Sequence, residues 1–181
     1  MRILIFFFLC AITAGQAQPD PEKIYWQDEP LSWEDFKARP AKGSSFQANT
    51  NAGLSYSWNL KNDNGIVSLK YEVYSFFNPQ SSWVIPASKS EYLLKHEQLH
   101  FNITELHARK LRKALAGLEI EQLGEDPKAV LNSFYTRIEK ERAVMQHKYD
   151  LETNHSLNKE AEARWQKFVK EELSKLKDYQ A

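Results

Sequence analysis

Residues 93–101 read LLKHEQLHF, in which His96 and His100 lie four positions apart and Glu97 follows the first histidine. Four residues are slightly more than one helical turn, so in a helix both imidazoles would lie on one face. Such a pair can bind one metal ion beside the helix, and the glutamate can reach a water molecule there as a general base. The stretch therefore predicts a helix with a metal site on its buried face.

The HExxH pattern is short enough to arise by chance, at a rate on the order of one in a hundred for a chain of this length and composition. Its helical context makes it more informative. On a helical wheel His96, His100 and His107 share the face that carries most of the leucines, and we expect this face to be buried. The opposite, outward face carries Gln98, Asn102, Glu105 and Arg109, and Lys110 is the one charged residue on the inward side.

Three helices are predicted in the second half of the chain. The first spans residues 88–116, beginning at a serine followed three positions later by glutamate, which matches a capping box, and ending before Gly117. The second spans residues 127–147 and the third residues 157–177, because apolar residues recur at helical spacing in both. The polar stretch YDLETNHS, at residues 149–156, is predicted to be the loop between them.

Residues 46–84 show the pattern of β-strands. Apolar and polar residues alternate along NAGLSYSWNL and IVSLKYEVYSFF, and KNDNG between them provides a turn at Gly65. Before this hairpin, residues 18–45 predict an extended segment with one short helical turn at Trp33 and Phe36. The predicted fold class is α+β, with a small antiparallel sheet packed on the HExxH helix and two further helices.

Length and the first residues predict a single exported domain. The chain has 181 residues, of which 42% are hydrophobic, enough for one core. Residues 1–17 combine a basic start, an apolar run and small residues at the end, which predicts a cleaved signal peptide and a secreted or periplasmic domain at residues 18–181. The apolar run is shorter than the roughly 20 residues of a membrane span, so we expect none.

Cleavage would also remove the single cysteine, Cys10, so neither a thiol nucleophile nor a disulfide would remain in the mature protein. Removing Arg2 from the 24 basic residues leaves 23, against 24 acidic residues. A chain without a basic excess offers no electrostatic reason to bind nucleic acid.

A catalytic zinc ion usually has three protein ligands and one open position, so a third ligand is needed beside the two motif histidines. His107 lies seven residues beyond His100, about 10 Å along a straight helix, which is too far for the same ion. A glycine that could turn the chain between the two histidines is missing from HFNITELH. We therefore expect His107 to be a core histidine or to orient another ligand.

The candidates for the third ligand cluster in HKYDLETNHS. His155 is the first choice because imidazole is a frequent zinc ligand, and Glu152 is the alternative. Asp150 could orient a ligand. Tyr149 could donate a hydrogen bond to the oxyanion of a hydrolytic reaction, or it could simply pack as a buried aromatic ring. His147 is expected at the surface, at a helix end.

These motifs together resemble a bacterial family of uncharacterised domains that is described as predicted secreted zinc-dependent proteases. The likeness rests on HEQLHFNITELHARKL, on the later YDLETNHS and on the upstream LSWEDFKARP, and it covers most of the chain after the signal segment. It implies that His96 and His100 are ligands, that Glu97 is the catalytic base and that His155 completes the site. The family often has glycine after this last histidine, where this chain has Ser156.

The resulting prediction is a secreted or periplasmic zinc metallopeptidase of zincin-like fold, which uses Zn²⁺ and Glu97 to hydrolyse a peptide or protein substrate. A second hypothesis is a zinc-binding envelope module without turnover. A third is a helical packing protein without a metal. The glutamate of the motif favours the enzyme, because a purely structural metal site has no use for a base.

Overall fold

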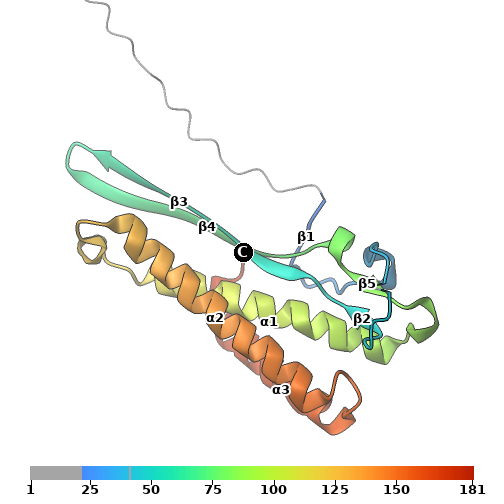
Figure 1. The fold of residues 1–181 in the computed structure, drawn as a ribbon. Coiled ribbons are helices and arrows are strands. Elements are labelled where there is room, and N and C mark those ends of the chain that lie inside the picture. Colours follow the sequence, from blue (N-terminus) through green and yellow to red (C-terminus); the bar gives the residue numbers. More distant parts are fainter. Residues whose placement is uncertain (1–21, 41) are drawn as a thin grey trace, which may run out of the picture.

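A long antiparallel hairpin lies along a group of helices in the residues that the structure describes, 22–40 and 42–181 of a computed structural model (Figure 1). The predicted signal peptide lies outside these residues. The strands are β1 (Ile24–Tyr25), β2 (Ala48–Asn49), β3 (Ala52–Asp63), β4 (Ile66–Phe77) and β5 (Trp83–Val84). The α-helices are α1 (Glu91–Ala116), α2 (Pro127–Thr153) and α3 (Lys159–Lys175). Short 3-10 turns are η1 (Trp33–Asp35), η2 (Pro79–Ser81), η3 (Pro86–Ser88), η4 (Ile120–Leu123) and η5 (Lys177–Tyr179).

The predicted hairpin is confirmed. Strands β3 and β4 pair in continuous register from Ala52 opposite Phe77 to Asp63 opposite Ile66. The two residues between them, Asn64 and Gly65, have φ angles of 53° and 91°. Both values are positive, as a tight two-residue hairpin turn requires, and asparagine followed by glycine is the sequence that adopts them most readily. The strand order in this sheet is β1-β4-β3, and β2 forms a separate pair with β5.

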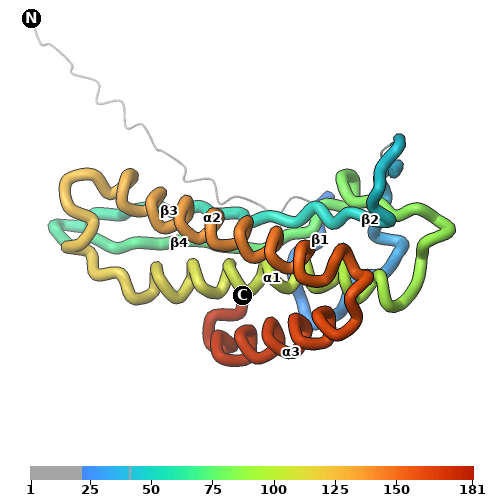
Figure 2. The backbone as a smooth tube through the Cα atoms, turned by 60° about the horizontal axis from the view of Figure 1, so that its bottom comes forward, coloured from blue at the N-terminus to red at the C-terminus, as the bar shows by residue number. Residues whose placement is uncertain are grey.

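Helix α1 occupies the centre of the molecule. It packs against β4 on one side and against α2 and α3 on others, and Figure 2 shows it running along the hairpin. Leu54 and Val73 of the hairpin meet Ala108, Leu111 and other apolar residues of α1 in one core cluster. An α+β architecture with a small antiparallel sheet and three helices in the described residues therefore agrees with the predicted class.

One face of α1 was predicted wrongly. Glu105 and Arg109 were expected to point outward, but their exposed fractions are only 1% and 3%. Ser75 of β4 donates a hydrogen bond of 2.6 Å to Glu105, and the Arg109 guanidinium donates to Glu105 at 2.9 Å and to Gln180 at 2.9 Å. A helical wheel assumes a single covered face, whereas the sheet and the C-terminal segment cover α1 from further directions.

The predicted helix bounds also need correction. Helix α1 is capped by Ser90, whose hydroxyl accepts from the Leu93 amide at 3.1 Å, whereas Ser88 belongs to η3. Helix α2 continues through the stretch that was predicted to be a loop and ends at Thr153. The stretch was expected to bend as a loop toward the first helix, but Tyr149 and Asp150 reach α1 from the last turns of a continuous helix. Helix α3 is shorter than predicted and begins after its cap, Asn158.

The N-terminal segment agrees with its prediction. The rings of Trp33 and Phe36 lie 4.9 Å apart around η1, and Phe36 in turn contacts Phe77 at 5.0 Å. This aromatic chain packs the segment on the end of the hairpin. Among the described residues, every helix is too short or too polar to cross a membrane.

Candidate metal centre

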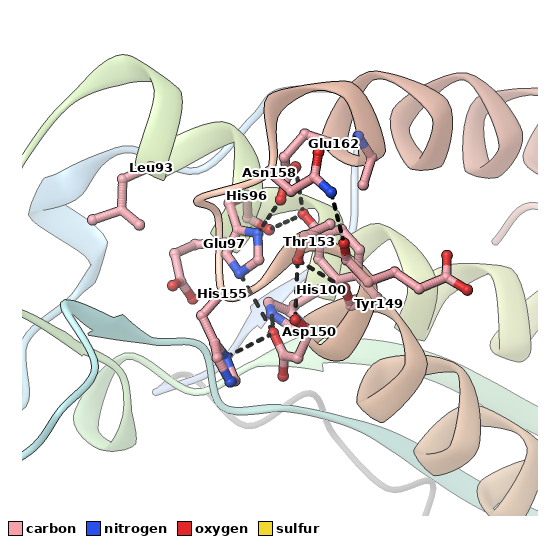
Figure 3. Close-up of polar contacts among 12 residues, drawn as sticks. Leu93, His96, Glu97, His100, Tyr149, Asp150, Thr153, His155, Asn158 and Glu162 are labelled. Carbon is pink, nitrogen blue, oxygen red and sulfur yellow. Dashed lines mark hydrogen bonds and ion pairs between the residues drawn. The ribbon is translucent and has the colours of Figure 1, made fainter.

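Three side chains from two helices converge at one point. His96 and His100 come from α1, and Asp150 comes from the last turns of α2 (Figure 3). The Nε2 atom of His100 lies 3.0 Å from Asp150 Oδ1, and that of His96 lies 3.5 Å from the same oxygen. One ligand atom from each residue lies within 4.8 Å of the other two. A pair of imidazoles and a carboxylate at this spacing can hold one divalent ion.

The other ring nitrogen of each histidine is held by a neighbour. His96 Nδ1 lies 2.5 Å from Glu162 Oε1, and His100 Nδ1 lies 2.5 Å from Gln146 Oε1. The amide nitrogen of Gln146 is already used, because it donates to the His100 carbonyl at 2.8 Å. Its oxygen is therefore the acceptor, and Nδ1 of His100 carries the proton. With Nδ1 donating in both rings, both Nε2 atoms face Asp150, and a metal ion bound there would take the place of any proton on Nε2.

Glu97 is buried beside this cluster. Only 3% of the residue is exposed, and among the described residues its Oε2 atom has no hydrogen-bond partner. Burying a carboxylate oxygen without a partner is costly, so such an atom is expected where it receives a proton or faces a cation. Thr50 donates a hydrogen bond of 3.3 Å to the Glu97 carbonyl and thereby holds the segment before β3 against α1.

A cleft of about 310 Å³ opens in front of these residues. Its walls are α1, α2, residues 46–52 and the turn after α2. Arg142 is its one lysine or arginine among the described residues, and it donates to the Ala52 carbonyl at 3.3 Å and to Glu139 at 2.8 Å. The other lining residues are Phe46, Gln47, Ala48, Asn49, Thr50, Ala52, Leu93, His96, Glu97, His100, Gln146, Asp150 and His155.

Electrostatics in the cleft favours a cation. Burial lowers the pKa of His96, but hydrogen bonds with Asp150 and Glu162 outweigh it and raise this pKa to about 9. Burial alone would raise the pKa of Asp150, but hydrogen bonds from His100 and His96 lower it well below its usual range. Asp150 is therefore a carboxylate at neutral pH, and together with Glu162 it stabilises positive charge at the His96 ring.

Tyr149 holds Glu162 in place. Its hydroxyl donates to Glu162 Oε2 at 2.8 Å, and its ring stacks on His96 with the centroids 4.7 Å apart. Burial, followed by the charge of Glu162, raises the pKa of Tyr149 far above its usual value. The hydroxyl is directed at Glu162 and not into the cleft. Of the two roles predicted for Tyr149, the geometry therefore favours a packed, buried aromatic ring over a donor to the oxyanion.

Neither of the two residues that the sequence suggested as third ligand is among the three converging residues. His155 follows α2 and is about half exposed, with its Nδ1 atom 3.6 Å from Asp150 Oδ1 and its ring 4.7 Å from that of Phe46. It lines the cleft but is not one of the three converging residues. Glu152 turns away, because its Oε2 atom accepts from the Trp165 indole at 2.8 Å. Asp150 stands where a third ligand is needed.

The other two histidines are not part of the cluster. His107 is fully buried and donates from Nδ1 to the Ile103 carbonyl at 2.8 Å, which agrees with the predicted core histidine. His147 is exposed, as predicted, although it lies within α2 and not at its end.

Three consecutive residues after α2 adopt left-handed backbone conformations. The φ angles of Asn154, His155 and Ser156 are 48°, 51° and 73°. Such a run is strained for residues with a side chain, and strained backbone is found most often at functional sites. The amide of His155 donates to the Asp150 carbonyl at 3.0 Å. The turn therefore folds the chain back and places His155 beside Asp150.

Sequence reasoning missed Gln146, Glu162 and Arg142 and gave Asp150 only a supporting role. A usable signal existed in α2, because Arg142, Gln146 and Asp150 are spaced by four and share one helical face. The predicted end of the helix at residue 147 hid this spacing. For Glu162 we find no comparable local signal, since it lies 66 positions from His96.

Fold and site together define an α+β protein with a candidate metal centre between α1 and α2. The chain belongs to the family described as bacterial proteins of unknown function, DUF922, whose profile matches residues 34–156. Neither a curated protein nor a solved structure gave a match. The expected resemblance to a bacterial family of uncharacterised domains is thereby confirmed. The matched residues include the three converging residues and Glu97 but end before Glu162 on α3.

Proposed function

We propose that the protein is a zinc-dependent metallopeptidase of zincin-like fold. One observation carries the proposal: two Nε2 atoms and one carboxylate oxygen converge beside the buried Glu97, at the wall of an open cleft, and among the described residues the Oε2 atom of Glu97 has no hydrogen-bond partner. Because a signal peptide is expected at residues 1–17, we propose that the enzyme is secreted or periplasmic.

The residues fit a zinc ion. His96, His100 and Asp150 supply the two nitrogens and one oxygen that are common in catalytic zinc sites, leaving a position open toward the cleft. Glu162 and Gln146 fix both rings with the correct nitrogen available. When bound, zinc would polarise the scissile carbonyl and lower the pKa of a water molecule. Other divalent ions can use the same ligands, so metal identity needs direct measurement.

The chain itself supplies the proton transfers and a place for the substrate. Glu97 would take a proton from the attacking water and pass it to the leaving amine. In its two-stranded sheet β2 pairs on one side with β5, and Ala48 and Asn49 also line the cleft. An extended peptide can therefore add along this segment through main-chain hydrogen bonds.

The proposal is tested with Glu97→Gln beside the unchanged protein. We expect about one zinc per chain in both by elemental mass spectrometry, and hydrolysis of a fluorogenic peptide mixture to fall at least about a hundredfold in the variant. His96→Ala and Asp150→Ala should lose the metal, whereas His147→Ala, an exposed histidine on α2, should keep it. Full activity in Glu97→Gln would refute the assigned base.

One observation favours a second candidate, a zinc-binding module without turnover. His155 lies 3.6 Å from Asp150 and could close the site as a fourth ligand. In that case His155→Ala would weaken zinc binding and the native protein would cleave no peptide. A native protein without any zinc, even after zinc is supplied, would leave only the packing role for the histidines.

A further inference from the structure

A second concave site lies on the helical side of the molecule. It is a groove of about 470 Å³ between α1, α2 and α3, which we call the helical groove, and its lining includes His107, Lys110, Val144, Arg164, Trp165 and Phe168. It shares no lining residue with the metal cleft. Its volume lies in the range of sites for small molecules.

The floor and one wall of the helical groove are apolar. Val144 is 61% exposed and Phe168 is 41% exposed, although both are large hydrophobic residues. The rings of Trp165 and Phe168 meet edge to face with centroids 5.7 Å apart, and Met145 lies beside them. An aromatic ring would bury this surface, and Met145 can adapt its unbranched side chain to such a ligand.

His107 adds a polar group to this apolar groove. Its Nδ1 proton is donated to the Ile103 carbonyl, so its Nε2 atom carries a lone pair. That atom is buried and has no hydrogen-bond partner among the described residues. Burial lowers the pKa of His107 to about 4, which keeps the ring neutral at ordinary pH. The groove therefore lies over a fixed acceptor that is closed to solvent, and a hydroxyl or N–H donor of a ligand reaches it only where a lining side chain moves aside.

The rim carries two cations that have no ion-pair partner among the described residues. Within the described part of the chain, Lys110 and Arg164 form no ion pair, whereas Lys148 lies 3.7 Å from Glu152. Glu152 also accepts a hydrogen bond from Trp165. Glu141 is the other acid on the rim, so three cations face two carboxylates. The excess positive charge favours an anionic group on the ligand.

We propose that the helical groove binds a small aromatic carboxylic acid that also carries a hydroxyl or N–H group. The ring would lie on Trp165 and Phe168, the donor would reach His107 Nε2, and the carboxylate would pair with Lys110 and Arg164. This site is separate from the proposed peptidase site, because none of its lining residues lines the metal cleft.

The test is a titration of the purified protein with p-hydroxyphenylacetate, followed by calorimetry and by the nitrogen NMR shifts of the His107 ring. Phenylacetate lacks the donor and tyramine replaces the carboxylate with an ammonium group, so we expect each to bind at least tenfold more weakly. Arg164→Ala and His107→Phe should each weaken binding of the probe at least severalfold. Lys167→Ala, an exposed cation on α3 outside the groove, should not change it.

Binding with this ranking, together with a shift of the His107 Nε2 signal, supports the assignment. The proposal is overturned if the three compounds bind equally, if none of them shifts the His107 ring, or if Arg164→Ala binds the probe as well as the native protein does. The rim variant keeps the test decisive if His107→Phe does not fold, because Arg164 is exposed.

Discussion

Individual residues of the candidate metal centre are held by neighbours, some of which do not line the cleft. Glu162 illustrates this, because it accepts from Tyr149 with one oxygen and contacts His96 Nδ1 with the other. A carboxylate behind a ligating imidazole fixes the ring and increases its basicity. Glu162 is therefore a positioning residue, and its effect should be visible in metal affinity.

Glu162→Gln should weaken zinc binding about tenfold to a hundredfold while the protein stays folded, because the amide can still contact His96 but carries no charge. Competition with a chromophoric chelator measures the affinity. Glu160→Gln, an exposed residue two positions earlier on α3, is the matched control and should bind zinc normally. Equal affinity in the two variants would show that Glu162 does not act through His96.

His107 should make the stability of the protein depend on pH. Its pKa is about 4 in the folded chain and about 6.5 when unfolded, so between these values the unfolded chain binds more protons. The free energy of unfolding therefore falls as the pH falls from about 6.5 to about 4, by at most about 3 kcal/mol from this residue.

Urea unfolding of metal-free protein at several pH values in this window measures the effect. His107→Phe should have a flatter pH dependence than the native protein, because the carboxyl groups titrate alike in both. His147→Phe changes an exposed histidine and should retain the native slope. Parallel curves for native protein and His107→Phe would contradict the assigned shift.

At the scale of elements, the junction between α2 and α3 decides the shape of the cleft. Helix α2 has to continue far enough to bring Asp150 opposite α1, and the left-handed turn then has to reverse the chain within a few residues. Thr153 supports the reversal, because its carbonyl accepts from the Asn158 amide at 2.7 Å. The left-handed conformation is costly for non-glycine residues, so replacing one of them with glycine should change the stability of the protein.

Ser156→Gly should raise the free energy of unfolding by about 0.5–1 kcal/mol, since glycine adopts a φ of 73° without the steric penalty of a side chain. Thermal and urea unfolding measure the gain. Ser133→Gly places the same change on the exposed side of α2 and should destabilise by about 0.5–1 kcal/mol. A loss of stability in Ser156→Gly would mean that the serine side chain matters more than backbone strain.

At the scale of the whole molecule, the candidate metal centre joins elements that are distant in sequence. His96 and His100 belong to the central helix α1, Asp150 belongs to α2, and Glu162 connects the cluster to α3. A bound ion would therefore stabilise the packing of all three helices and not one local turn. Binding to the folded state alone raises stability through mass action.

Adding zinc to metal-free protein should raise its melting temperature, by an amount equivalent to about 2.7 kcal/mol when free zinc is a hundred times the dissociation constant. Calorimetry with and without a chelator measures the shift. Asp150→Ala should show almost none of it, whereas Glu97→Gln should retain it in full. An equal shift in Asp150→Ala would place the ion elsewhere on the protein.

Local patterns in the sequence were sufficient for the hairpin, for the existence of three helices and for two of the three converging residues. Alternation with an Asn64–Gly65 turn specifies a hairpin, and the spacing of His96 and His100 specifies a shared helical face, because both depend only on neighbours in the chain. These features needed no knowledge of packing.

Only the tertiary structure decided how the site is completed. Asp150 becomes a candidate ligand, and Glu162 becomes the support of His96, because helices far apart in sequence pack against each other. The burial of Glu105 and Arg109 has the same origin, since their partners come from β4 and from the C-terminal segment. Periodicity reports which residues share a face, but it carries no information about which other element covers that face.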